Sequence, residues 1–432
     1  MQIHGLHAQV ARSTRLISRK LGVVREFRRG HNQPFDPRIV SYSATTCDPR
    51  AFSDDALVHQ AGGAGLSWMP AFLATVGEAV ERYGSGFYRR DALVRASARE
   101  LRAAGHAIAG PEAFALFHPT QYDREGFPFT PFTDDLEIHW ERMRDLATGE
   151  DILCPAVFVY MPFRADPVMI SEQISTGFAA HGDPVRAALG GIFEVVERDA
   201  FMIAWMNELP MRKLRLTGAL GRMVTDTLPH HFDIHLLDMT TDIGLPSVLG
   251  LMRGVHDFGP FIAVCAATRF TLLEAARKTV IELCQSIPYY RSLVDDDRSF
   301  DRFEDVRTFA DHGIFYIKRP DLAGVFNPWI EAPADWDVPE EAEPDPVRQL
   351  GEVARRFTRQ GRRILVRDKT TPDLKDAGFS LQRVVIPGLI HLNGDYSAYY
   401  LGGRRLYEAP VLMGHKVQRT FETLNRLPHP FP

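Results

Sequence analysis

The sequence predicts an α/β or α+β protein, because short β-prone runs alternate along it with longer stretches of helical periodicity. Two near-copies of one pentapeptide fall within such helical stretches: Glu-Ala-Val-Glu-Arg at residues 78–82 and Glu-Val-Val-Glu-Arg at residues 194–198. The candidate site residues are interleaved with the predicted strands and helices from residue 78 to residue 285. This interleaving favours one catalytic unit over separate modules.

Composition excludes several classes of protein. The chain has 432 residues, with 45% hydrophobic and 24% charged residues, which is typical of a globular protein with a sizeable core. A net charge of −5 argues against nucleic acid as an obligate partner. No apolar run is long enough to span a bilayer, and the basic N-terminus lacks the apolar core of a secretory signal. The cysteines are widely spaced, which predicts neither a zinc site nor a disulfide framework and makes a reducing cytoplasm the default location.

The N-terminal part of the chain mixes β-prone runs with turn signals. Leu16-Ile17 and Val23-Val24 flank Gly22, which suits a first strand and turn, and residues 39–43 suit another strand. We therefore expect residues 1–60 to form an N-terminal β-rich segment that packs on a catalytic core of residues 61–432.

The middle of the chain contains two of the expected helices. Gly62, Gly63 and Gly65 predict a glycine-rich turn, and a helix should follow from about Pro70. Residues 156–160 resemble a buried strand, and a second helix should begin near Pro184, a residue suited to a first helical turn. The apolar face of the first helix should comprise Leu73, Val76, Val80 and Tyr83, and that of the second Val185, Leu189, Ile192, Phe193 and Val196.

Further strands and one more helix are expected towards the C-terminus. Residues 234–237 and 261–266 are predicted strands, and residues 272–290 form a third predicted helix. Residues 327–346 alternate prolines with acids and predict an exposed, mobile loop. After it, residues 364–366 and 384–386 predict strands of the resumed core.

The repeated pentapeptide suggests a metal-dependent phosphate site. On a helix, residues three and four apart share a face, so each copy aligns two carboxylates and a guanidinium. Four carboxylates that converge from two helices repel one another unless a divalent cation neutralises them. The third predicted helix carries Glu282 and Gln285, again three apart. A solvated helix face with Glu–Arg pairs is the alternative explanation of one such pattern.

These motifs resemble the YcaO family, in particular its members that modify ribosomally made peptides. The similar stretches follow the family's order along most of the chain: Gly63-Ala64-Gly65, residues 77–83, residues 175–180, residues 193–200, residues 281–286, residues 385–389 and the proline-rich end at residues 428–432. The resemblance implies a YcaO-like fold of mixed sheets and helices that carry a carboxylate-rich ATP and Mg²⁺ site.

The resemblance also assigns roles to individual residues. It implies that Glu78, Glu81, Glu194 and Glu197 bind Mg²⁺. It places Arg82 and Arg198 near the phosphates of ATP and adds Glu282 and Gln285 to the same nucleotide site. Oxygen ligands suit Mg²⁺, and arginine binds phosphate bidentately, so these roles are chemically coherent. In the cyclising branch the proline-rich tail implies a catalytic role in proton handling for the terminal carboxylate, here on Pro432.

The implied activity is that of an ATP- and Mg²⁺-dependent cyclodehydratase subunit. Such an enzyme forms thiazoline or oxazoline rings from Cys, Ser or Thr of a precursor peptide. No part of the sequence resembles a leader-binding domain, so an E1-like or ThiF-like partner protein is implied. The family also suggests a homodimer and a flavin dehydrogenase that acts afterwards. Two alternatives are a YcaO-like scaffold with impaired ATP binding, and a thioamide- or amidine-forming enzyme, which the terminal Pro-x-Pro-x-Pro argues against.

The chain departs from the family pattern mainly at nucleotide contacts. Ala64 replaces a lysine and Ala74 replaces a serine, while Gly182 and Arg186 stand where relatives often have asparagine and an acid. Each lost charge-assisted contact removes about 1.5–3 kcal/mol, so we expect weaker ATP binding unless Arg186 or Lys278 supplies positive charge. We expect Asp199 to cap a helix or pair with an arginine rather than react. We expect Asp238 and Asp242 to shape the turn after a strand, with an approach of Asp242 to the site as the alternative.

Overall fold

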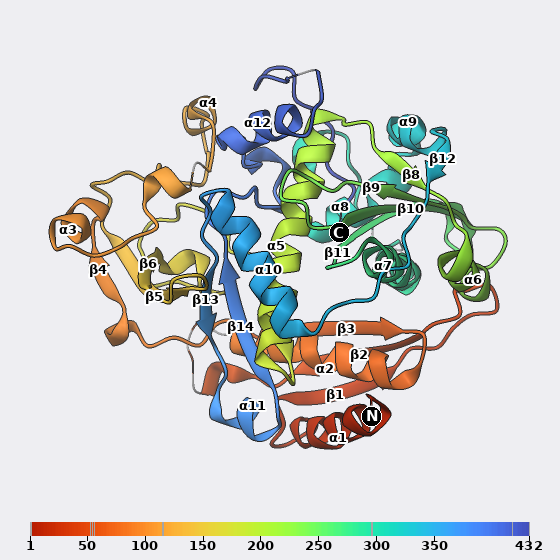
Figure 1. Ribbon diagram of the computed structural model, residues 1–432, viewed down its shortest axis with the longest axis horizontal. Coiled ribbons are helices and arrows are strands. Elements are labelled where there is room, and N and C mark those ends of the chain that lie inside the picture. The colour runs from red at the N-terminus through yellow and green to blue at the C-terminus, as the bar shows by residue number, and fades with distance from the viewer. Residues whose placement is uncertain are drawn as a thin grey trace. The chain divides into compact units, whose positions relative to one another are not determined.

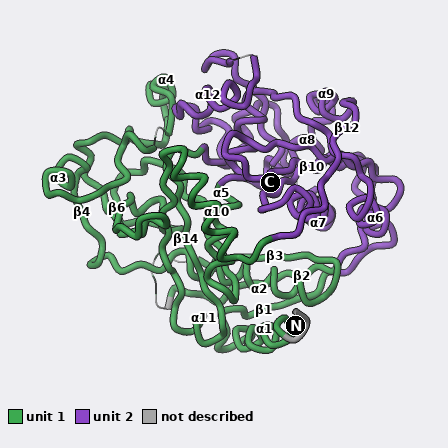
Figure 2. The backbone as a smooth tube through the Cα atoms, viewed as in Figure 1, with its two compact units in different colours: residues 1–30, 40–195, 344–389 green, residues 31–39, 196–343, 390–432 purple. Residues whose placement is uncertain are grey.

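The computed structural model describes residues 2–51, 53, 55, 57–114, 116–294, 297–416 and 418–431. The chain divides into two compact units (Figures 1 and 2). Unit 1 comprises Met1–Gly30, Val40–Val195 and Pro344–Leu389. Unit 2 comprises His31–Ile39, Val196–Glu343 and Ile390–Pro432. The predicted mixture of sheets and helices is confirmed.

One sheet of unit 1 is a three-stranded antiparallel sheet in the order β1-β2-β3. Its strands are β1 (Val24–Arg29), β2 (Val40–Thr46) and β3 (Gln60–Gly65), and helix α2 (Trp68–Gly84) follows directly. The strands expected near residues 24 and 40 are therefore present. The residue-60 boundary of the expected N-terminal segment falls at the first residue of β3.

The glycine-rich turn predicted at residues 62–65 is wrong, because these glycines lie within β3. Their role is close packing against α2. A Cβ atom on Gly63 would lie 2.4 Å from the backbone nitrogen of Thr75, and one on Gly65 would lie 2.9 Å from that of Ala71. Glycine is required here because the helix backbone lies almost against the strand.

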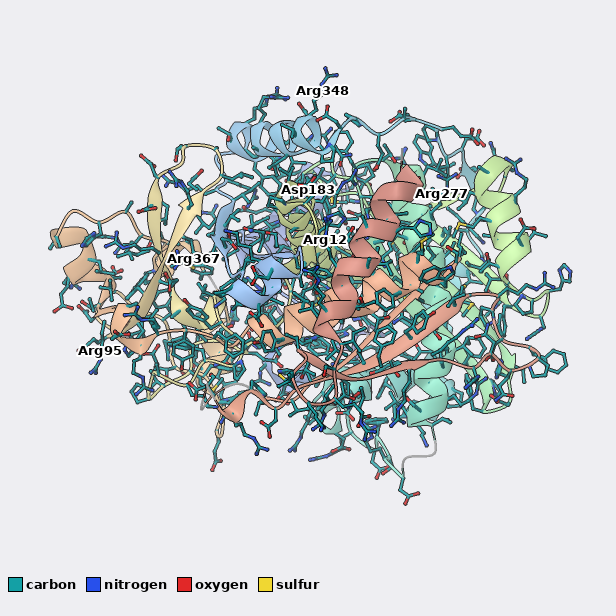
Figure 3. All side chains as sticks on the ribbon, turned by 90° about the horizontal axis from the view of Figure 1, so that it is seen from below. Arg12, Arg95, Asp183, Arg277, Arg348 and Arg367 are labelled. Atoms are coloured by element: carbon teal, nitrogen blue, oxygen red, sulfur yellow. The ribbon has the colours of Figure 1, made fainter. Side chains whose placement is uncertain are left out.

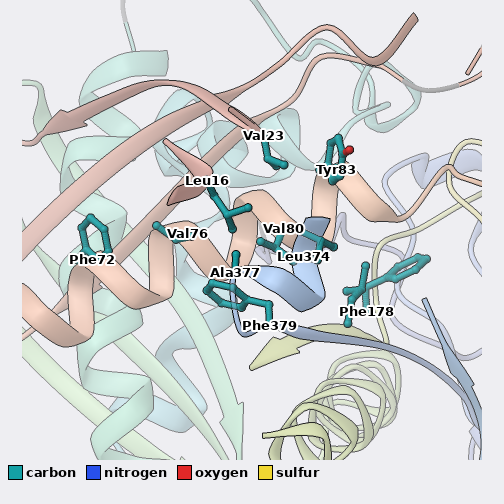
Figure 4. Close-up of a cluster of buried hydrophobic side chains, with 11 residues drawn as sticks. Leu16, Val23, Phe72, Val76, Val80, Tyr83, Phe178, Leu374, Ala377 and Phe379 are labelled. Carbon is teal, nitrogen blue, oxygen red and sulfur yellow. The ribbon is translucent and has the colours of Figure 1, made fainter. Parts of the chain in front are cut away.

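A hydrophobic cluster around α2 forms the core beside this sheet (Figure 4). The predicted apolar face is confirmed, since Val76, Val80 and Tyr83 are buried and Leu73 packs against the same cluster. Leu16 joins the cluster from the short 3-10 helix Thr14–Leu16 that follows helix α1 (Gln2–Ser13), and neither helix was expected from the sequence. Other members come from much later in the chain and include Leu374 and Phe379.

The second sheet of unit 1 has the order β4-β5-β13-β14-β7, with β6 paired to β5. The predicted strand at residues 156–160 is wrong: the strand β6 ends at Pro155, and Ala156–Phe158 form a buried 3-10 turn. Strands predicted at 364–366 and 384–386 are found as β13 and β14. The elements are β4 (Val94–Ala96), α3 (Ala98–Ala103), α4 (Pro119–Tyr122), β5 (Ile138–Asp145), β6 (Asp151–Pro155), β7 (Phe178–His181), α10 (Pro346–Arg359), β13 (Leu365–Asp368), α11 (Pro372–Asp376) and β14 (Ser380–Val385). Figure 3 draws the side chains, with Arg12 labelled on α1 and Arg348 on α10.

Unit 2 is built on a five-stranded sheet in the order β11-β10-β9-β8-β12. The predicted strands at 234–237 and 261–266 and the helix at 272–290 are confirmed. Strand β10, which lies between two of the predicted elements, was not anticipated. The elements are β8 (Arg212–Leu214), α6 (Gly218–Thr227), β9 (Asp233–Asp238), β10 (Ser247–His256), β11 (Gly259–Thr268), α7 (Leu272–Leu293), α8 (Phe309–Lys318), α9 (Asn327–Ile330), β12 (Ala334–Trp336) and α12 (Arg404–Leu412).

The acidic and proline-rich stretch at 327–346 contains more regular structure than expected. It includes α9, whose Trp329 and Ile330 are buried, and β12, which pairs in parallel with β8. The guanidinium of Arg212 lies 3.6 Å from the ring centroid of Trp336 and supports this pairing. The stretch thus makes apolar contacts that its acidic and proline-rich composition did not predict, through Trp329, Ile330 and Trp336.

Two properties of the chain as a whole complete the description. Among the helices in the described ranges, none combines the length and the apolar character needed to cross a membrane. Cys47, Cys154, Cys265 and Cys284 are free thiols.

Candidate active site

Helix α2 carries the first copy of the motif. Its apolar residues point into the cluster around Val76 and Val80, so the motif side chains lie on the remaining, partly buried face. Arg82 Nε donates to Glu78 Oε1 at 2.8 Å, one turn away. Glu81 Oε1 accepts a hydrogen bond from the backbone N–H of Ala180 in β7 at 2.7 Å.

The second copy lies on α5 (Pro184–Asn207), the helix predicted to begin near Pro184. Its first glutamate, Glu194, accepts a hydrogen bond from the backbone N–H of Gly177 at 2.9 Å. Gly177 has a φ of +94°, and a Cβ atom there would lie 2.3 Å from the carbonyl oxygen of Val384. Only glycine can therefore aim this N–H at the carboxylate.

Glu81 responds to the two other motif carboxylates of unit 1. Burial raises the pKa of Glu81 well above its usual value, and the negative charges of Glu78 and Glu194 raise it further. The same carboxylates raise the pKa of Arg82 against the opposing effect of its burial. The structure thus relates three of the four glutamates that were expected to converge.

These three carboxylates suit Mg²⁺ by their chemistry, but they do not form a preformed metal cage. All three groups offer carboxylate oxygens, which Mg²⁺ prefers, and their mutual repulsion is what a divalent cation relieves. Across the described ranges, no three His, Cys, Asp or Glu side chains already stand together as a metal cage. Arg82 and two backbone amides hold the carboxylates instead, so binding requires these side chains to reorient.

Binding of magnesium nucleotide is expected to release protons and to strengthen as pH rises. Because folding raises the pKa of Glu81, protonated Glu81 contributes to the folding stability of the metal-free protein. This contribution is fully present below pH 4.5, the ordinary pKa, and is lost as pH rises through the raised pKa of the folded state. A proton on Glu81 must leave before its carboxylate binds a cation. Calorimetry in buffers of different protonation enthalpy measures this release. Glu81→Gln should remove it, and binding without proton release in the wild type would contradict the assignment.

The second half of α5 belongs to unit 2 and carries Glu197 and Arg198. Glu197 is 7% exposed, and its Oε2 accepts a hydrogen bond from the backbone N–H of Thr268 at 3.3 Å. Its Oε1 lies 3.6 Å from Nη1 of Arg198. The Arg198 guanidinium also lies 4.3 Å from the ring centroid of Phe431, close to the C-terminus.

Helix α7 places Glu282 and Gln285 one turn apart, as predicted. Glu282 forms a salt bridge with Lys278. Although burial acts in the opposite direction, Lys278, Arg269 and Arg198 together lower the pKa of Glu282. Glu282 therefore lies among basic side chains of unit 2 that favour its charged form.

Asp199, directly after the second motif, pairs with an arginine as expected. It is fully buried, and Arg405 donates to it through Nε at 2.8 Å and Nη2 at 2.7 Å. Arg405 Nη2 also lies 2.9 Å from Asp242 Oδ1, which ties the turn after β9 to helix α12. Asp199 is thus a structural partner of Arg405.

The residues that depart from the family pattern are spread over different elements. Ala64 is a buried residue of β3, and Ala74 is exposed on α2. Gly182 and Arg186 are exposed around the start of α5. Lys278, considered above as a substitute cation, is already paired with Glu282.

The sequence analysis missed Arg383, a buried arginine in β14. It donates to the carbonyl oxygen of Phe158 through Nε at 2.8 Å, and its guanidinium lies 4.3 Å from the ring centroid of Phe178. Burial lowers its pKa, and the negative charge of Glu194 opposes that change. Gln382 and Arg383 are adjacent polar residues between the apolar residues of β14, and this pattern alone does not separate a buried arginine from an exposed one. The predicted catalytic residue Pro432 lies outside the described residues.

Several solved structures share this fold. A heterocyclase in complex with substrate and cofactor superposes with a TM-score of 0.79 at 21% identity, over 99% of this chain and 57% of that one. YcaO from Methanopyrus kandleri, bound with AMPPCP and Mg²⁺, gives 0.63 at 16% identity over 93% and 94%. The E. coli microcin synthetase McbBCD complex with pro-MccB17 bound gives 0.59 at 14% identity over 94% and 96%. These identities establish a shared fold.

Residues 62–390 match the YcaO family, described as ATP- and Mg²⁺-binding YcaO cyclodehydratases. The chain therefore belongs to the YcaO family, as its motifs predicted. A curated relative, an uncharacterized protein in the tfuA 3′ region of Rhizobium leguminosarum bv. trifolii, is 27% identical over 197 residues. The match covers 44% of each chain, so the protein spans less than half of that relative's length.

Proposed function

We propose that this protein is the ATP- and Mg²⁺-dependent cyclodehydratase subunit of a system that forms azolines in a ribosomally made precursor peptide. The observation that carries the proposal is the pair of Glu-x-x-Glu-Arg motifs on α2 and α5, in a chain that matches a family described as ATP- and Mg²⁺-binding cyclodehydratases. The effect of burial and of the Glu78 and Glu194 charges on the pKa of Glu81 supports a cation-binding role for these motifs.

The proposed reaction removes one water from the peptide for each ring. A Cys thiol, or a Ser or Thr hydroxyl, adds to the preceding backbone carbonyl carbon. The former carbonyl oxygen then takes the γ-phosphoryl group of ATP and leaves as phosphate, with ADP as the other product. Loss of the amide proton closes the C=N bond of the azoline. Bound Mg²⁺ would neutralise phosphate charge.

Side chains of this protein would orient ATP and stabilise the charge that develops during phosphoryl transfer. Glu78, Glu81, Glu194 and Glu197 would hold the cations. Arg82 and Arg198 would contact phosphates, as guanidinium groups do bidentately. Glu282 and Gln285 on α7 would complete the nucleotide contacts.

We further propose that the protein acts with others. The McbBCD structure is a complex that contains its peptide, which supports a peptide substrate and partner proteins for this chain. A leader-binding partner of the E1-like type, a homodimer of this chain, a later flavin dehydrogenase and a cytoplasmic location are the specific forms that we propose. The free thiols are compatible with a reducing compartment.

Calorimetric titration of the purified chain with a non-hydrolysable ATP analogue, with and without Mg²⁺, tests the nucleotide site first. We expect magnesium-dependent binding. A precursor peptide incubated with the protein, its partner and ATP should then lose one water per ring, as measured by mass spectrometry. Absence of nucleotide binding, alone and with the partner, would instead favour the scaffold with impaired ATP binding.

A further inference from the structure

The last described residues of the chain, 428–431, are held inside unit 2. His429 is fully buried and Phe431 is 5% exposed. A frayed terminus would leave both side chains in solvent. Specific contacts in unit 2 must therefore hold this tail.

Hydrogen bonds fix both backbone N–H groups of the described tail and the carbonyl oxygens of its first two residues. Pro428 and Pro430 have no N–H, which leaves two donors in the tail. The N–H of His429 donates to the hydroxyl of Tyr399 at 2.9 Å, and the N–H of Phe431 donates to Nδ1 of His429 at 3.3 Å. The hydroxyl of Tyr316 donates to the carbonyl oxygen of Pro428 at 2.8 Å.

His429 has a defined hydrogen-bonding pattern of its own. Its Nε2 lies 2.9 Å from the carbonyl oxygen of Asn393, while its Nδ1 accepts from Phe431. These partners assign a neutral ring with the proton on Nε2. Both ring nitrogens are thus satisfied without a charge.

His312, on α8, holds His429 from one side. The two rings stack with centroids 3.6 Å apart and planes at 11°. Nδ1 of His312 lies 2.7 Å from the carbonyl oxygen of His429, and its Nε2 lies 3.1 Å from that of Gly394. A neutral ring has only one N–H, and the shorter distance favours donation from Nδ1 to the tail.

The held tail ends beside the second motif. The ring of Phe431 lies 4.3 Å from the Arg198 guanidinium and 4.8 Å from the ring of Phe201, and both of these residues belong to α5. A shift of the tail by one residue would move the ring of Phe431 away from both Arg198 and Phe201. The register of the tail and the environment of Arg198 are therefore coupled.

We propose that His312 is a positioning residue: it holds His429 and thereby sets the register of the C-terminal tail beside Arg198. The consequence for catalysis rests on the proposed function and on the proton-handling role that the family resemblance implies for Pro432. His312 itself does not touch the reacting atoms. Its effect is transmitted through the tail backbone.

Amide hydrogen exchange of His429 and Phe431, followed by mass spectrometry, tests the structural part of this proposal. Loss of one buried hydrogen bond should speed exchange at both amides by about tenfold. We expect this for His312→Ala and for Tyr399→Phe. In His312→Asn a side-chain amide N–H can still donate near the position of Nδ1, so protection should be largely restored.

Tyr407→Phe is the matched control. Tyr407 lies on α12 in the same unit and donates its hydroxyl to the carbonyl oxygen of Leu401 at 2.6 Å, away from the tail. Its removal should leave exchange of the tail amides unchanged. Tyr399→Phe keeps its ring and deletes one hydroxyl, so it serves if His312→Ala does not fold.

Steady-state kinetics tests the catalytic part. His312→Ala should reduce kcat for ring formation by about tenfold or more and leave KM for ATP unchanged, whereas His312→Asn should recover most of kcat. Unchanged tail exchange in both His312→Ala and Tyr399→Phe would overturn the proposal. Faster exchange with an unchanged kcat would also overturn it. If the wild type forms no rings, the proposed function fails, and the exchange data still decide whether His312 holds the tail.

Discussion

Changing Glu194 to Gln is expected to reduce magnesium-dependent ATP turnover by about 100-fold or more and to leave the protein folded. The glutamine retains an oxygen that can accept the hydrogen bond from the N–H of Gly177, so the local backbone should not change. The substitution removes one negative charge from a set in which Glu81 already responds to that charge. ADP release at saturating Mg²⁺ measures turnover, and circular dichroism checks the fold.

Glu352→Gln provides the matched control. Glu352 lies on α10, also in unit 1, and pairs with Arg355 and Arg356, so it represents an ordinary Glu–Arg helix face. Its substitution should leave turnover unchanged. A fully active Glu194→Gln protein would remove the metal-ligand assignment. Equal losses in both variants would show that the effect is not specific to the motif.

The site could be predicted where its information is local in the sequence. Glu78, Glu81 and Arg82 share a helix face because of their spacing, and the apolar positions around them define that helix without any tertiary contact. The same reasoning placed Glu194 on α5 and Glu282 on α7. Asp199 was also interpreted correctly, although its partner Arg405 lies 206 residues further along.

The predictions failed where tertiary packing decides the structure. Gly63 and Gly65 were taken for a turn because glycine is common in turns, whereas here it permits close contact between β3 and α2. Arg383 was missed because its partners, the carbonyl oxygens of Phe158 and Thr176, are more than 200 residues away. Nothing local in the sequence distinguishes such an arginine from an exposed one.

In the C-terminal tail, too, tertiary packing decides contacts of single side chains that the sequence does not predict. Its proline spacing predicted a functional C-terminus, and the prolines do remove N–H donors that burial would otherwise leave unsatisfied. The stacking of His429 on His312 depends on the packing of α8. Sequence spacing alone gave no reason to connect these two histidines.

Changing Arg405 to Met is expected to lower the free energy of unfolding by about 3–5 kcal/mol, the largest effect on stability that the structure predicts. Arg405 is 4% exposed and Asp199 is 0% exposed at their side chains. Without the guanidinium, the N–H of Ile390, at 2.9 Å, is the hydrogen bond from the described part of the chain that remains to the buried negative charge of Asp199. Urea denaturation followed by fluorescence measures the change.

The adjacent residue on α12 gives a control for this prediction. Arg404 is 86% exposed and pairs with Glu408 across one turn, so Arg404→Met should cause no measurable change in stability. Similar losses for Arg404→Met and Arg405→Met would contradict the role assigned to the buried pair.

Asp199→Asn completes a double-mutant cycle and separates a structural role from a catalytic one. Asparagine can still accept from the N–H of Ile390, and Arg405 keeps Asp242, so the single change should destabilise less than Arg405→Met. In the double variant the buried charge is gone, so the two losses should not add. If Asp199 only supports α5 beside Glu197 and Arg198, the folded Asp199→Asn protein should retain ATP turnover. Loss of turnover without loss of stability would instead assign Asp199 to the chemistry.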